Sequence, residues 1–165
     1  MIEMTRPNWD ETFMDILPIL EKRVTCKYYK VAAVLAYKGR IISFGYNGPG
    51  RGDVHCTVVG CAKEDNEGNK LPPGSGKCRG CHCEMNVFLN IVFLGISLKE
   101  KEAGESTLYV SIRPCFDCAK HIGNSGIKRI IYRDDYDGDQ VVFDYCKERE
   151  IELIKFKDIK KKEVV

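Results

Sequence analysis

Two short segments, each at the predicted start of a helix, constrain the fold of this chain more than any other feature. The first, KCRGCHCEMNVF (77–88), holds four potential metal ligands within six positions: Cys78, Cys81, His82 and Cys83. Glu84 follows them directly, and the second segment, PCFDC (114–118), adds Cys115 and Cys118. If both segments serve one metal ion, the fold must bring these two helix starts together.

The first half of the chain is predicted to contain a helix, a hairpin and a long loop. Apolar residues at helical spacing over about 8–25 predict a helix, which Pro18 should kink or split. The runs KVAAVLAY (30–37) and RIISFGY (40–46) flank a tight turn and predict an antiparallel hairpin. Residues 47–81 are rich in Gly and Pro, so they are predicted to form a loop that something must hold in place.

Strands and helices alternate through the second half. Helices are predicted at 83–94, 114–126 and 140–149, and strands at 107–112, 128–133 and 151–156. This alternation favours parallel strands joined by crossover helices. The prediction is a single α/β domain over residues 1–165, a three-layer α/β/α fold with a mixed, roughly five-stranded central sheet. The 83–94 helix is apolar on nearly all sides, so we expect it at the centre or at a subunit contact.

Composition narrows the classes of protein to consider. The chain carries 26 basic and 24 acidic residues, a formal net charge of +2, which indicates no nucleic-acid or membrane partner. No run approaches the roughly 20 apolar residues needed to span a bilayer, so a cytoplasmic location is expected. In a reducing compartment, the odd number of nine cysteines indicates metal binding or catalysis rather than a disulfide framework.

The residue types at the two helix starts suit a catalytic zinc ion. One imidazole (His82) and two thiolates (Cys115 and Cys118) make three protein ligands, which leaves the fourth position for water. Glu84 is not needed as a ligand, so its carboxylate can move protons between water and a substrate. Taken alone, the two cysteines could instead be a buried pair or a redox motif, and the histidine could be structural.

Together the two segments, His-x-Glu and Pro-Cys-x-x-Cys, match the signature of zinc-dependent deaminases. The chain resembles the deoxycytidylate (dCMP) deaminase family, within the cytidine deaminase superfamily, over roughly residues 8–155. The matching segments are NWDETFM, CKYYKVAAV, GRIISFGYNG, HCEMN, LYVSIRPCFDCAK and SGIKRIIY. The family usually has Ala where Cys83 stands, so Cys83 is expected to fill space rather than bind metal.

The resemblance implies zinc-dependent hydrolytic deamination of dCMP to dUMP with release of ammonia, feeding thymidylate synthesis. The catalytic zinc ligands that it implies are His82, Cys115 and Cys118. Glu84 would protonate the ring nitrogen and then the leaving amine, Asn47 would contact the sugar and base, and Tyr136 would line the base pocket. Two alternatives stay open: a deaminase of another cytosine nucleotide or nucleoside, such as dCTP or deoxycytidine, and a catalytically silent, zinc-stabilised binding or regulatory domain.

The resemblance also suggests roles for the remaining cysteines. Many microbial and viral members carry a second, structural zinc that holds the long loop. The cysteines at positions common in the bacterial branch are Cys26, Cys56, Cys61 and Cys78. Four thiolates would close a tetrahedral site, with His55 and Cys81 as competitors for a place in it. Cys146 is expected to pack in the core.

The resemblance also bears on how the substrate phosphate is bound, on effectors and on assembly. A mononucleotide substrate needs cations for its phosphate, and the candidates next to motifs are Arg51, Arg113 and Lys120. Regulated family members respond to dCTP and dTTP and are commonly hexamers. We therefore expect these two effectors and a homo-oligomer, with a hexamer suspected.

Overall fold

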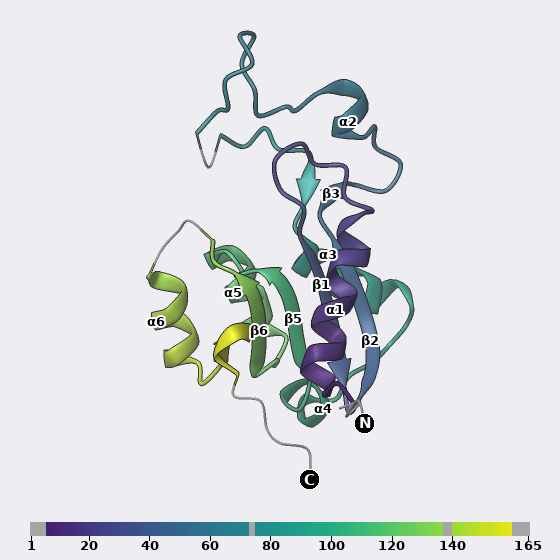
Figure 1. The fold of residues 1–165 in the computed structure, drawn as a ribbon, viewed down its shortest axis with the longest axis vertical. Helices are drawn as coiled ribbons and strands as arrows, with labels where there is room; N and C mark the ends of the chain where they lie inside the picture. The colour runs from purple at the N-terminus through teal and green to yellow at the C-terminus, as the bar shows by residue number, and fades with distance from the viewer. Residues whose placement is uncertain (1–5, 73–74, 137–139, 160–165) are drawn as a thin grey trace, which may run out of the picture.

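A five-stranded mixed sheet forms the centre of the molecule in the computed structural model, which describes residues 6–72, 75–136 and 140–159 (Figure 1). The strands are β1 (Ala32–Tyr37), β2 (Arg40–Tyr46), β5 (Thr107–Ile112), β6 (Arg129–Asp134) and β7 (Glu152–Lys155). Their order is β2-β1-β5-β6-β7. β1 pairs antiparallel with both β2 and β5, whereas β5–β6 and β6–β7 pair parallel. The predicted antiparallel hairpin and the parallel crossovers are both confirmed.

Helices cover both faces of this sheet, so the predicted three-layer α/β/α fold is confirmed. The helices are α1 (Trp9–Glu21), α2 (Cys56–Val59), α3 (Cys83–Phe93), α4 (Glu100–Gly104), α5 (Phe116–Asn124) and α6 (Val141–Glu148), and a 3-10 turn, η1 (Phe156–Asp158), follows β7. On one face, α1 buries apolar residues against one set of alternate strand side chains. On the other face, α3, α5 and α6 bury theirs against the intervening set. Successive strand residues point to opposite faces, which supplies both cores from the same strands.

Helix α1 begins with a capping box, in which the Asn8 side chain accepts from the Glu11 backbone and the Glu11 carboxylate accepts from the Asn8 backbone. The sequence predicts a kink or a split at Pro18; the helix runs unbroken to Glu21, so the split does not occur. Pro18 is exposed in the later part of the helix. Its ring therefore displaces no core side chain, and Leu17 beside it is fully buried.

The long loop contains more structure than its composition predicts. Its two ends pair as short antiparallel strands, β3 (Gly48–Pro49) and β4 (Gly80–Cys81), and α2 lies between them. In Figure 1 the loop projects beyond one end of the sheet. β3 follows β2 closely, and β4 lies just before α3. Their pairing therefore brings Asn47, the residue after β2, close to the start of α3.

The described residues contain no helix long and apolar enough to cross a membrane. All nine cysteines lie in the described part of the chain and all are free thiols. Cys146 is buried in α6 among core side chains, as predicted.

Candidate active site

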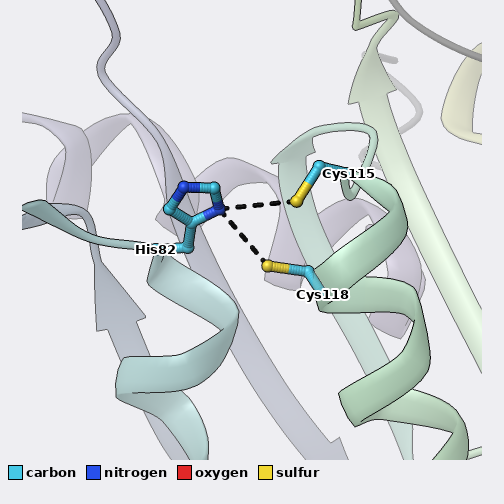
Figure 2. A group of neighbouring side chains, drawn as sticks. All are labelled: His82, Cys115 and Cys118. Atoms are coloured by element: carbon cyan, nitrogen blue, oxygen red, sulfur yellow. Dashed lines mark hydrogen bonds between the residues drawn. The ribbon is translucent and has the colours of Figure 1, made fainter. Parts of the chain in front are cut away.

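Two helix starts meet at the carboxyl end of β5. His82 is the N-cap of α3, and Glu84 lies in the first turn of that helix. Cys115 is the N-cap of α5, and Cys118 lies one turn further on. Both helices pack on the same face of the sheet, so their first turns lie side by side (Figure 2).

The three predicted metal ligands converge. His82 Nδ1 lies 3.5 Å from Cys115 Sγ and 3.4 Å from Cys118 Sγ. The three ligand atoms all lie within 4.8 Å of one another, and no other trio of His, Cys, Asp or Glu in the described ranges meets that condition. One imidazole and two thiols from two rigid helix starts fit the soft, tetrahedral preference of zinc and leave one position open.

Protonation of the three side chains agrees with a metal site. A hydrogen bond from Cys118, joined by one from His82, lowers the pKa of Cys115 to about 4, against the opposing effect of burial. The hydrogen bond to Cys115 and burial together raise the pKa of Cys118, so the pair holds one proton between them. The hydrogen bond with Cys115 raises the pKa of His82. A metal cation would displace these protons and bind both sulfurs as thiolates.

Glu84 is almost completely buried, with 4% of its surface exposed. Burial raises the pKa of its carboxyl group, which suits a side chain that must take up and release a proton. The neighbouring Cys83 thiol donates a hydrogen bond to Glu84 Oε2 at 3.2 Å. The prediction that Cys83 packs in the core is confirmed, but the side chain also touches the carboxylate.

A cleft of about 220 Å³ opens in front of His82 and Glu84. Both predicted substrate residues, Asn47 and Tyr136, line it. The Asn47 side chain holds the backbone ahead of β1, because its Oδ1 accepts from Val31 N at 2.8 Å and its Nδ2 donates to Tyr29 O at 3.0 Å. An amide has two N–H groups and two lone pairs, so one of each is left for a ligand.

The four cysteines predicted to hold a structural zinc line the same cleft but do not form a closed site. Cys26, Cys56, Cys61 and Cys78 all reach it, as does Cys81. No three of these sulfurs meet the 4.8 Å condition that His82, Cys115 and Cys118 satisfy. Backbone N–H groups at 3.4 Å donate to the sulfurs of Cys26, Cys61 and Cys78. His55 lies elsewhere, on a groove beside β2 and α3.

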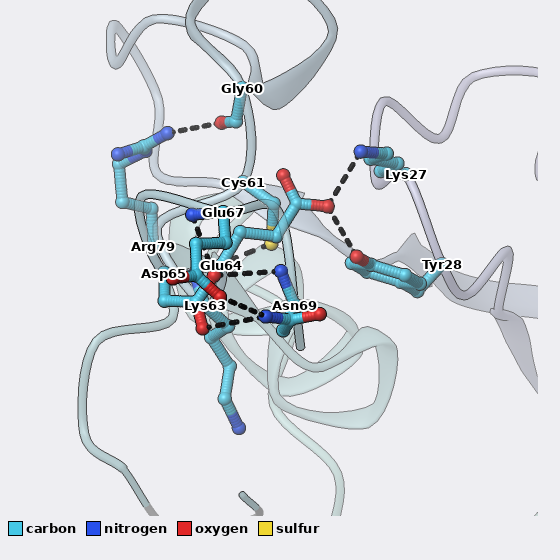
Figure 3. A network of polar contacts seen from close by, with 10 residues as sticks. All are labelled: Lys27, Tyr28, Gly60, Cys61, Lys63, Glu64, Asp65, Glu67, Asn69 and Arg79. Carbon is cyan, nitrogen blue, oxygen red and sulfur yellow. Dashed lines mark hydrogen bonds and ion pairs between the residues drawn. The ribbon is translucent and has the colours of Figure 1, made fainter. Parts of the chain in front are cut away.

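Polar contacts hold the loop in shape (Figure 3). Glu64 accepts from Lys27 Nζ at 2.6 Å and from the Tyr28 hydroxyl. Asp65 accepts from the backbone N–H groups of Glu67 and Asn69 and so closes a tight turn. These bonds tie the loop to the segment before β1.

The three cations predicted as phosphate ligands lie in different places. Lys120 pairs with Asp117 at 2.7 Å on the surface of α5. Arg51 lies over the Phe93 ring, beside the second groove and outside the cleft. Arg113 lines the cleft, but it is buried, and its guanidinium donates to Tyr136 O at 2.8 Å and stacks on Phe143. The cleft has another cation that sequence reasoning missed, Lys70.

An α/β/α domain that brings an imidazole, two thiols and a buried carboxylate to adjacent helix starts has the ligand set of a zinc site with one open position. Residues 7–134 match the family model described as the cytidine and deoxycytidylate deaminase zinc-binding region. The chain therefore belongs to the cytidine and deoxycytidylate deaminase family.

Individual relatives agree with this assignment. The chain is 31% identical to a deoxycytidylate deaminase of Schizosaccharomyces pombe over 81% of its own length, but it spans only 39% of that relative. It is 31% identical to the deoxycytidylate deaminase of Mycobacterium phage D29 over 78% of its length, and spans 97% of that protein. The crystal structure of dCMP deaminase from the cyanophage S-TIM5 with dCMP and dUMP superimposes with a TM-score of 0.70, at 25% identity over 92% of this chain and 98% of the other.

Proposed function

We propose that this protein, as a single domain, hydrolyses dCMP to dUMP and ammonia. The observation that carries the proposal is the convergence of His82, Cys115 and Cys118 beside a cleft that His82, Cys115 and Glu84 line. Membership of the deaminase family and the named activity of the relatives support the choice of substrate.

The residues of the site divide the chemistry between them. His82, Cys115 and Cys118 would hold the zinc ion, which when bound acts as a Lewis acid that makes water acidic enough to attack at neutral pH. Glu84 accepts the proton that this water loses. The same carboxyl group passes that proton to the ring nitrogen of cytosine. It then takes the second proton of the former water from the hydroxyl on the attacked carbon and gives it to the departing amino group, so that water and dCMP become dUMP and ammonia.

Substrate contacts are proposed for Asn47 and Tyr136. Asn47 lies on the wall of the cleft, and its remaining N–H and lone pair suit a deoxyribose hydroxyl or a base edge. Tyr136 follows the end of β6 and lines the cleft, where an aromatic ring can pack on a base.

A second, structural zinc held by Cys26, Cys56, Cys61 and Cys78 is also proposed. Support comes from their shared position along the cleft and from the N–H donors aimed at three of the sulfurs, since such bonds stabilise thiolates. Closure of the site would draw the sulfurs together. Metal analysis tests this: about two zinc ions per chain support it, and one contradicts it.

Self-association is proposed from the outer face of α3. The exposed apolar residues there, continued by two on β2, are Leu89, Val92, Phe93, Leu94, Ile41 and Phe44. An apolar surface of this kind favours a subunit contact. We propose a homo-oligomer, with a hexamer as the model, and dCTP and dTTP as its effectors. A cytoplasmic location is also proposed, because nine free thiols fit a reducing compartment. Light scattering with and without the two nucleotides measures the assembly.

An ultraviolet assay with the zinc-loaded protein tests the proposed reaction. The substrates are dCMP, dCTP, deoxycytidine and cytidine, each with and without dTTP. Turnover of dCMP with the highest kcat/KM supports the proposal. Preference for dCTP or deoxycytidine reassigns the substrate, and turnover of none of them, with zinc bound, indicates a silent binding domain.

A further inference from the structure

We propose that Lys70, on the long loop, binds the 5′-phosphate of the substrate and so makes the enzyme prefer a nucleotide to a nucleoside. This inference rests on the proposed function and adds a phosphate-binding residue to it. Lys70 lines the same cleft as His82, Glu84, Asn47 and Tyr136. The hydrogen-bond partner of its ammonium, Tyr29, lies 41 residues away along the chain, so only the folded structure brings the two together.

Aromatic side chains fix the position of the Lys70 ammonium. Its Nζ donates to the Tyr29 hydroxyl at 2.8 Å. It also lies 4.5 Å from the centre of the Tyr29 ring and 5.0 Å from that of Tyr28. Cation–π contacts hold a cation in place without neutralising it. Lys70 is therefore a positioned positive charge, even though its side chain is exposed.

The backbone around Lys70 is held as well. Lys70 forms an isolated antiparallel bridge with Glu64, which ties it to the other side of the loop. Tyr29 is fixed from the opposite side, because its carbonyl accepts from Asn47 Nδ2. Asn47 thus connects the proposed sugar-binding position to the aromatic pair that holds the ammonium.

Lys70 has no ion-pair partner in the described part of the chain. Its neighbour Lys27 provides the contrast. Lys27 also approaches the Tyr28 ring, but its ammonium is paired with Glu64 at 2.6 Å and does not line the cleft. An ammonium has three N–H donors, and the Tyr29 hydroxyl uses one, so two are left for phosphate oxygens.

The other cations along the cleft fit the role less well. Arg79 donates to Gly60 O at 2.6 Å and serves to hold the loop. Arg113 is buried, and its guanidinium already donates to Tyr136 O and stacks on the Phe143 ring. No described contact orients the Lys63 ammonium. A mononucleotide with its base at Glu84 and its phosphate toward solvent would meet Lys70 at the exposed rim.

The test compares ligands that differ only in the phosphate. Calorimetry of the zinc-loaded full chain measures the Kd of dUMP and of deoxyuridine for wild type, Lys70→Gln, Lys70→Arg and the matched control Lys27→Gln. Because a charge-assisted bond to phosphate is lost, we expect Lys70→Gln to weaken dUMP roughly 10- to 100-fold and deoxyuridine by less than about twofold. Lys70→Arg should restore most of the affinity for dUMP, and Lys27→Gln should change neither ligand.

The outcomes separate this inference from the proposed function. Equal weakening of both ligands by Lys70→Gln, no weakening of dUMP, or no binding of dUMP to the wild type would overturn the role of Lys70. A wild type that deaminates dCMP with a KM unchanged by Lys70→Gln keeps the function and rejects the inference. A wild type that binds dUMP through Lys70 but turns over no cytosine compound keeps the inference and rejects the function.

Discussion

The Cys83 thiol donates a hydrogen bond to Glu84 Oε2 across 3.2 Å, and both side chains are buried. The contact joins a residue that the sequence pattern predicts only to fill space to the carboxylate that we propose carries protons. Burial and the adjacent carboxylate both raise the pKa of Cys83 well above its ordinary value, so the thiol keeps its proton and can remain a donor.

Replacing Cys83 tests this contact. Cys83→Ala removes the donor while leaving the fold and the zinc ligands in place, so we expect kcat for dCMP to fall about 2- to 10-fold with KM unchanged. Cys83→Ser keeps a donor and should recover part of the loss. An unchanged kcat in the alanine variant, with zinc content equal to wild type, would mean that the hydrogen bond does nothing for catalysis.

The carboxylate of Asp10 should contribute to stability in a pH-dependent way. Asp10 binds Arg129 through two bonds, at 3.0 and 2.8 Å, and accepts from the Tyr109 hydroxyl at 2.6 Å. Burial opposes ionisation, but these bonds lower the pKa of Asp10 below 3.8. Because the pKa of Asp10 is lower in the folded state than in the unfolded state, the ionised carboxylate contributes its full stabilisation above the unfolded-state pKa. That contribution is lost as the pH falls through the folded-state pKa.

Asp10→Asn should therefore lower the free energy of unfolding by about 1–2 kcal/mol at neutral pH, as measured by urea titration. The difference from wild type should shrink as the pH falls below the ordinary pKa of an aspartate and through the lowered pKa of folded Asp10, because the wild-type carboxylate then becomes protonated. Asp15→Asn, on the exposed side of α1, serves as the control. A difference that stays constant with pH would show that the Asp10 charge is not responsible.

Asn47 should matter for both stability and substrate affinity, because it bonds Val31 N and Tyr29 O. Asn47→Ala leaves these backbone groups without their partner, so we expect a loss of about 1–3 kcal/mol in stability together with a higher KM for dCMP. Asn47→Asp keeps the acceptor for Val31 and should be less destabilising. A raised KM with unchanged thermal unfolding would assign Asn47 to the substrate alone.

Local pattern was sufficient to predict the main strands and helices and the candidate metal ligands. Period-two and helical spacing identified the five strands and the helices α1, α3, α5 and α6, and ligand types at helix starts predicted the group of His82, Cys115 and Cys118 that the fold brings together. The short helix α4 and the β3–β4 pair were missed. Five-residue and two-residue elements carry too little periodicity to detect, and tertiary packing decides whether they form.

The contacts of the long loop could not be read from the sequence for a different reason. Lys70 meets Tyr29, and Glu64 meets Lys27, across separations of 41 and 37 residues. Nothing in the local spacing of these residues indicates a partner so distant. The same holds for Asn47, whose expected substrate role is accompanied by two backbone bonds that only the folded chain reveals.

The most direct test of the account is dCMP turnover by the Glu84→Gln variant beside wild type, with zinc content measured in both. Glutamine preserves the shape of the side chain but cannot carry the proton. We expect wild type to release ammonia and form dUMP, and the variant to keep its zinc and lose roughly 10²- to 10⁴-fold in kcat. Wild-type turnover in the variant, or no turnover in a zinc-loaded wild type, would contradict the central claim.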